Sequence, residues 1–412
     1  MLTIIMSLLF VAPEWVRKLT KERQPDIFWA EYVVFPIVQI VVVLVVILTL
    51  IAWLIYLERR NSKWLQANLT GWRVTPWATL RPAAASIKRL LKADGIPADS
   101  DKAIFRLSPL LSFIAAFLAL ALMPWGATWA TIASVNIGFL FIFAFSSLSA
   151  LGLTLAGWSE ESPTAPTAAL RSAAQVIVYY LAMGLAASGV LIFSHTLSMT
   201  GIVEAQQADH IWYIAFQPLG FLLFVVAAVV VTNHTATTIT ADDAEHQDYR
   251  WSLFLISEYL QMIVLAATMV TLYLGGWSFP GLSAIKNQVA QTIVSILIFA
   301  AKTLLLLYAM RWLKRRLPPH QLLEFGWRWA LPAGLTNILI TAILYALAMP
   351  ATRGGVFEMM RETSGRLLPM GRGYAYFIIA GLLLALAFIW LAKRDWKFSN
   401  KPEMQNNKML DS

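Results

Sequence analysis

The chain of 412 residues is 58% hydrophobic and 13% charged, with a mean hydropathy of +0.64. This composition excludes an ordinary soluble globular protein and indicates a chain embedded in lipid. A formal net charge of +9 fits basic residues beside membrane spans and anionic headgroups better than a nucleic-acid partner. With no cysteine and no histidine pair at ligand spacing among five histidines, the sequence offers no disulfide and no metal motif.

Apolar runs of membrane-spanning length recur along the chain and predict an all-α integral membrane protein with about nine transmembrane helices. The expected spans are 32–56, 107–124, 132–156, 169–193, 211–233, 251–275, 287–310, 329–349 and 373–392. Alternate connections place 22 Lys and Arg residues on one side and 9 on the other. Because cytoplasmic loops carry the excess of basic residues, we expect the N-terminus outside and the C-terminus inside.

The segments that flank the spans are distinct in composition. Residues 1–31 form an N-terminal segment whose short apolar start predicts a surface or packed segment rather than a cleaved signal. After the first span, 79–92 repeats apolar residues at helical spacing between basic ones. This pattern predicts an amphipathic helix in the membrane interface, or one packed on the protein itself. Residues 351–392 hold a loop and the additional span, and 393–412 form a polar cytoplasmic tail.

Two ionisable side chains lie inside predicted spans. Glu258 is about two turns into the sixth span, and Lys302 is at a similar depth in the seventh. A charge in lipid costs at least about 2.5 kcal/mol, so both side chains should face the protein interior. Their depths permit a pair, which would be either a step in a proton relay or an ion pair that only fixes helix packing.

Further charged candidates lie near the cytoplasmic ends of spans. Asp242, Asp243 and Glu245 belong to an acidic loop at about 234–250, where clustered carboxyls can share protons or simply be solvated. Arg171 introduces the fourth span with Gln175 one turn later, which predicts an anchoring role at the headgroups. No phosphate-binding loop, dinucleotide fingerprint or catalytic triad is present, so we expect no metal, flavin or nucleotide on this chain.

Several segments resemble the H-type membrane subunit of NADH:quinone oxidoreductase, respiratory complex I. They occur in the same order as in that family, over a core of about 32–350. The matching segments are Glu58-Arg59-Arg60, Ile96–Lys102, Phe105–Pro109, Gly157–Ser159, Leu170–Gln175, Ile202–Gln206, Gln217–Phe221, Glu258-Tyr259, Leu274–Trp277, Lys302–Leu306 and Arg316–Pro318. Each piece is short, but together they span most of the chain.

The resemblance implies a membrane component that anchors the peripheral redox arm, walls a chamber for ubiquinone or menaquinone, and links quinone reduction to proton translocation. Its partners would be the other membrane-arm and peripheral-arm subunits together with membrane lipids, in the cell membrane. The isolated chain would have no activity. The implied chamber and loop residues are Glu58, Arg59, Arg60, Lys88, Asp242, Asp243 and Glu245, and the implied proton path contains Glu258 and Lys302.

The chain departs from the family at several polar positions. Ala85 stands where the family has an aspartate, Tyr180 stands where it has a carboxylate within span four, and Val231 replaces a glutamate before the acidic loop. Two alternatives to a quinone-linked subunit are open, and these losses favour the first of them. One is a non-redox scaffold that anchors a peripheral arm, and the other is the membrane subunit of an energy-converting hydrogenase.

Overall fold

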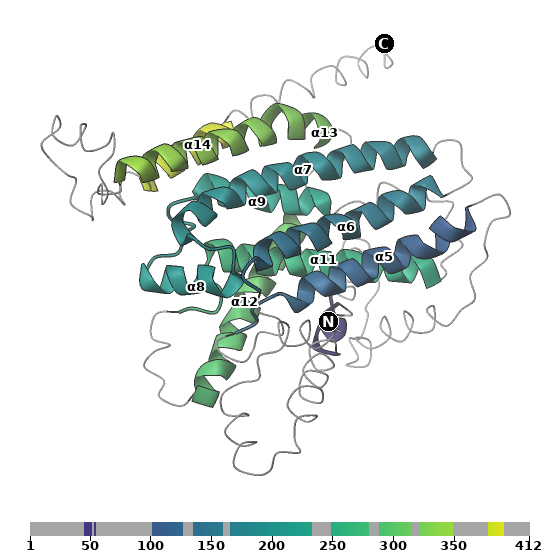
Figure 1. Cartoon of the computed structure of the whole chain (residues 1–412), viewed down its shortest axis with the longest axis horizontal. Helices are drawn as coiled ribbons and strands as arrows, with labels where there is room; N and C mark the ends of the chain where they lie inside the picture. The colour runs from purple at the N-terminus through teal and green to yellow at the C-terminus, as the bar shows by residue number, and fades with distance from the viewer. Residues whose placement is uncertain are drawn as a thin grey trace, which may run out of the picture.

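The computed structural model describes residues 45–51, 53–54, 101–126, 135–159, 165–232, 249–279, 288–314, 322–348 and 378–390. The regular elements of this part of the chain are helices (Figure 1). Five of them are long and apolar enough to cross a membrane: Lys102–Ala121, Gly138–Trp158, Ala169–Ser194, Leu253–Tyr273 and Ala290–Leu313. The prediction of an all-α membrane protein is therefore confirmed, while the count of nine spans and the orientation stay predictions.

Helices α5 (Lys102–Ala121) and α6 (Gly138–Trp158) pack closely side by side. Asp101 caps α5 by accepting hydrogen bonds from the backbone of its first turn. In the middle of the pair, the hydroxyl of Ser112 donates to the Ser149 carbonyl, and the hydroxyl of Ser149 donates to the Ser112 carbonyl, both at 2.9 Å. Gly152 lies against Ser112, where a side chain would not fit. Small residues of this kind allow helix backbones to approach in membranes.

Helix α7 (Ala165–Ser194) is followed by α8 (Met199–Ala208) and α9 (Pro218–Val231). The expected span 211–233 was too long, because α9 has 14 residues and rises only about 21 Å. The helix begins at Pro218, a residue suited to the first helical turn, and α8 was not predicted. The turn between them keeps its backbone hydrogen-bonded, as buried membrane backbone requires. The Tyr213 N–H donates to the Gln206 side chain, and the Ile214 N–H donates to the Tyr273 carbonyl.

Helix α11 (Tyr249–Tyr273) is central in the bundle, behind α5 and α6 in Figure 1. Its apolar stretch is 89% buried, whereas that of α12 (Gln288–Lys314) is only 33% buried. A helix that is apolar on all sides and enclosed by protein has to place any polar side chain in a contact or a cavity. This burial makes the polar residues of α11 the first candidates for function.

The last described helices cover α7. Helix α13 (Leu322–Phe325) leads through a π-helical turn (Gly326–Ala330) into α14 (Leu331–Ala348). The Tyr179 hydroxyl donates to the Leu322 carbonyl at 2.8 Å and ties this turn to α7. The additional helix Ile378–Trp390 packs with Gly381 against Pro218 at the start of α9.

Candidate functional site

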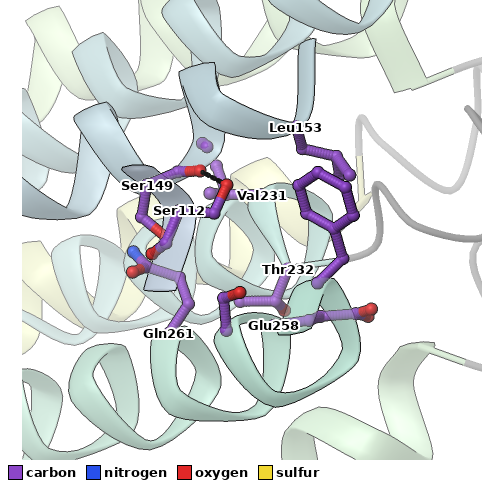
Figure 2. Close-up of a pocket in the computed structure, with 10 residues that line it drawn as sticks. Ser112, Ser149, Leu153, Val231, Thr232, Glu258 and Gln261 are labelled. Carbon is purple, nitrogen blue, oxygen red and sulfur yellow. Dashed lines mark hydrogen bonds between the residues drawn. The ribbon is translucent and has the colours of Figure 1, made fainter. Parts of the chain in front are cut away.

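A pocket opens beside α11 and contains the only carboxylate that the sequence predicted within a span, Glu258 (Figure 2). The pocket is small, with room for on the order of two water molecules, and it is partly open to solvent. Residues at i, i+3, i+4 and i+7 of α11 form one wall, because these positions share a helix face. The lining residues are Ser112, Ser149, Ala150, Leu153, Val231, Thr232, Phe254, Ser257, Glu258 and Gln261.

The side chains of Glu258 and Gln261 are arranged differently within this wall. Glu258 is half-buried, whereas Gln261 is buried with 4% of its surface exposed. Figure 2 shows the Gln261 amide on the side of Ser112 and Ser149, and the Glu258 carboxylate pointing away from both serines. The pocket therefore has a carboxylate toward one end and neutral hydrogen-bonding groups toward the other.

The polar groups of the other walls are already fixed by the helices that carry them. The hydroxyls of Ser112 and Ser149 donate to backbone carbonyls of the facing helix, and that of Thr232 donates to the Ala228 carbonyl at 2.9 Å. These hydroxyl oxygens therefore face the pocket as hydrogen-bond acceptors. The apolar Leu153 and Phe254 pack together beside them.

The similar depths of Lys302 and Glu258 permitted a pair, but the ammonium group of Lys302 binds elsewhere. Its ammonium group donates to the carbonyls of Leu274, Gly276 and Ser278 at 2.7, 3.0 and 2.8 Å. These carbonyls belong to the segment that directly follows α11. At a rise of about 1.5 Å per residue, Leu274 lies about 24 Å from Glu258 along the helix axis. The ammonium nitrogen also lies 4.5 Å from the centre of the Trp212 ring. Equal depth counted along the sequence did not place the two side chains together, because α12 runs at a steep angle to α11 (Figure 1).

Arg311 lies near the Glu258 end of α11. Its guanidinium carbon lies 5.5 Å from the centre of the Tyr259 ring, and Nη1 donates to the Leu54 carbonyl at 2.8 Å. The expected span 287–310 ended just before Arg311, whereas the structure places this residue in the last turn of α12. Arg311 therefore links the described helical residues around Leu54 to Tyr259 on α11.

Glycines form the site of the Lys302 ammonium group. Gly275 and Gly276 have φ angles of 71° and 54°, in the left-handed region that glycine adopts without strain. This conformation turns three carbonyls of one short segment toward a single point. The two glycines therefore form the turn that directly follows α11.

The remaining sequence candidates fall into two groups. Arg171 is exposed on α7 with Gln175 half-buried one turn later, and neither lines the pocket, so their anchoring role stays a prediction. The other candidates lie outside the described residues: Glu58, Arg59, Arg60, Lys88, Asp242, Asp243 and Glu245. Among the residues that are described, no group of three or more His, Asp or Glu could hold a metal ion.

Comparison with known proteins decides the family. A family described as NADH dehydrogenase matches residues 38–342. An H-type NADH-quinone oxidoreductase subunit of Geobacter metallireducens is 34% identical over 328 residues, covering 75% of this chain and 96% of the relative. The H-type subunit of the same oxidoreductase in Dehalococcoides mccartyi is 33% identical, covering 76% of this chain and 87% of the relative.

The chain belongs to the family of H-type membrane subunits of respiratory complex I. It is therefore a multi-pass membrane subunit of the NADH-quinone oxidoreductase type. Its partners are other subunits of such a complex.

Several residues of the pocket were missed by the reading of the sequence. Ser112, Ser149, Ser257 and Gln261 looked like ordinary small or polar residues in apolar helices. The signal was present only on α11, where Phe254, Ser257, Glu258 and Gln261 share one face. The serines of α5 and α6 become visible as pocket residues only when the packing of the helices is known.

Proposed function

We propose that this chain walls the quinone chamber of a complex I-type oxidoreductase and links quinone reduction to proton translocation, with Glu258 as the first proton carrier inside the bundle. Ubiquinone or menaquinone is the substrate. The observation that carries the proposal is the Glu258 carboxylate beside a partly open pocket, on the helix that is the most enclosed of the described spanning helices. Ionisable residues in spanning helices are costly and mark ion pathways.

The connectivity of the pocket supports this role. Thr232 lines the pocket, and the acidic segment that contains Asp242, Asp243 and Glu245 begins directly after it and returns to α11 at Tyr249. Both ends of that segment therefore meet the chain at the same end of the bundle as Glu258. In our proposal this end faces the cytoplasm and the peripheral arm, with nine spans and the N-terminus outside. Glu58, Arg59, Arg60 and Lys88 then belong to the chamber side.

Replacement of Glu258 by glutamine tests the proposal in the assembled complex reconstituted in liposomes. The amide keeps the shape and hydrogen bonding of the side chain but cannot carry a proton. We expect Glu258→Gln to assemble, to reduce quinone, and to lose coupled proton movement. Glu204→Gln is the matched control, because Glu204 is exposed on α8 and does not line the pocket. Unchanged proton movement in Glu258→Gln would contradict the role of this residue.

A second candidate function is a membrane anchor without a working quinone chamber. It is favoured by Tyr180, which stands in place of a family carboxylate and accepts a hydrogen bond from Gln261 at 2.8 Å. The side chain at this position is thus an uncharged, buried tyrosine that takes part in helix packing. A quinone-reductase assay of the complex purified with its partners separates the two candidates, since an anchor supports assembly but no quinone-dependent oxidation of NADH.

A further inference from the structure

Helix α9 is too short to cross a bilayer by itself. Its 14 residues rise about 21 Å, roughly 9 Å less than a hydrocarbon core of about 30 Å. The rest of the predicted span is the non-helical stretch 209–217, which we call the interrupted segment. Its residues Tyr213, Phe216 and Gln217 are buried, with at most 4% of their surface exposed. Irregular backbone at membrane depth is stable only where protein covers it, so each side of this segment needs a neighbour.

Three helices cover the interrupted segment from within the bundle. On α11, the Tyr273 carbonyl accepts a hydrogen bond from the Ile214 N–H at 2.9 Å. On α14, Asn337 Nδ2 donates to Gln217 Oε1 at 2.8 Å. On α7, Gly189 leaves room for the same amide, because a Cβ at this position would lie 2.6 Å from Gln217 Oε1. These contacts fix the segment on the sides that face α7, α11 and α14.

The C-terminal helix Ile378–Trp390 (yellow in Figure 1) covers the interrupted segment on a fourth side. Gly381 lies so close that a Cβ there would be 2.6 Å from Pro218 Cδ and 3.1 Å from the Phe216 carbonyl oxygen. This distance leaves no space for a lipid chain between the helix and the backbone at the start of α9.

The two faces of the C-terminal helix differ in what they contact. Gly381 and Ala385 are four positions apart on the buried face, a small-residue pattern that allows close approach of membrane helices. On the same face, the ring of Phe388 packs edge-on against Phe325 of α13, with 6.2 Å between centroids. The opposite face has large apolar side chains that are 49–62% exposed: Ile379, Leu382, Leu383, Leu386 and Trp390. The helix therefore lies between the interrupted segment and the exterior of the described bundle.

We propose that the start of α9 and α13 form a docking face for a membrane helix, and that the chain's own C-terminal helix occupies this face and seals the interrupted segment against lipid. The family match covers residues 38–342 and ends before this helix, so the seal is an addition to the region that defines the family. The proposal involves no quinone or proton step and does not rest on the proposed function.

The test uses the full chain in the assembled complex, with a protease site inserted between Gly354 and Gly355 in the predicted loop. Cleavage there cuts the connection to the C-terminal helix but leaves the helix in place. The first readout is the share of the C-terminal fragment that stays with the tagged remainder of the chain during washing in mild detergent. The second is the rate of hydrogen–deuterium exchange at the backbone amides of 213–217, all of which donate hydrogen bonds.

Two alanines of the C-terminal helix provide a matched pair of variants. Ala385 is buried against the bundle, whereas Ala387 is exposed on the other face. In the cut complex, we expect Ala385→Leu to release the fragment and to raise the exchange rate about tenfold, equivalent to about 1.4 kcal/mol. The unmodified chain and Ala387→Leu should retain the fragment and exchange slowly. If Ala385→Leu fails to assemble, Gly381→Ala adds a single methyl group to the same face and should release part of the fragment.

Three results would overturn the proposal. The first is a fragment that leaves the cut complex of the unmodified chain, and the second is equal behaviour of Ala385→Leu and Ala387→Leu. The third is slow exchange at 213–217 that persists after the fragment has been released, because a lipid or a partner subunit would then cover the segment without the helix.

Discussion

Substitution of Lys302 by methionine tests whether its ammonium group acts as a structural cap or as a proton carrier. Methionine keeps the unbranched apolar stem but has no donor for the carbonyls of Leu274, Gly276 and Ser278. Hydrogen bonds from charged groups contribute about 1.5–3 kcal/mol each, so the three bonds together contribute about 5 kcal/mol at the lower limit. Removing a partly buried charge also removes its desolvation cost of several kcal/mol, which offsets part of this loss. We expect a net destabilisation of about 2–4 kcal/mol.

The assay is reversible unfolding of the chain in the reconstituted complex, followed by tryptophan fluorescence, because Trp212 lies 4.5 Å from the Lys302 nitrogen. Lys302→Arg keeps the charge but spreads its donors in a planar fork, so it should recover only part of the stability. Leu305→Met is the control, since this residue lies on the same helix with 68% of its surface exposed. If Lys302→Met is as stable as the unmodified chain but no longer moves protons, then Lys302 acts in proton transfer and the capping argument is refuted.

Three glycine substitutions test the packing around glycine positions. Gly152→Ala would bring a methyl group to 2.3 Å from Ser112 Oγ, so separation of α5 and α6 should lower unfolding free energy by about 1–3 kcal/mol. Gly184→Ala, whose nearest contact is at 4.0 Å, should be neutral or stabilising in the same unfolding assay. Gly276→Ala should cost about 1–2 kcal/mol from its φ of 54° alone and add a contact at 2.5 Å with Val203. An unchanged unfolding midpoint in Gly152→Ala, or a lowered one in Gly184→Ala, would contradict this packing.

The long spanning helices were predictable from the sequence because each needs only a sustained apolar run. The expected spans 107–124 and 251–275 correspond to helices Lys102–Ala121 and Tyr249–Tyr273. The span predicted at 211–233 was wrong in length because hydropathy does not separate an apolar turn from an apolar helix. Pro218 marked the true start, but its effect depends on where the preceding turn finds hydrogen-bond partners.

Less of the candidate site was predictable, because its lining depends on which helix faces pack against one another. Glu258 stood out in the sequence since a carboxylate within an apolar run demands an explanation. Gln261 and the serines gave no comparable signal, because such residues commonly satisfy their own helix. The location of the Lys302 ammonium group could not be predicted for a different reason. Counting residues gives depth along one helix, whereas the position of Lys302 relative to Glu258 depends on the angle at which α12 crosses α11.

The enclosure of α11 limits how this part of the molecule can move. The helix touches every neighbour from α5 to α9 as well as α12, and the ammonium group of Lys302 holds the segment that follows its last turn. A piston stroke or axial rotation of this one helix would break all of these contacts together, and close-packed interiors resist such displacement. Mechanical work that reaches its carboxylate must therefore either reorganise side chains and solvent locally or carry the surrounding bundle along as one rigid block.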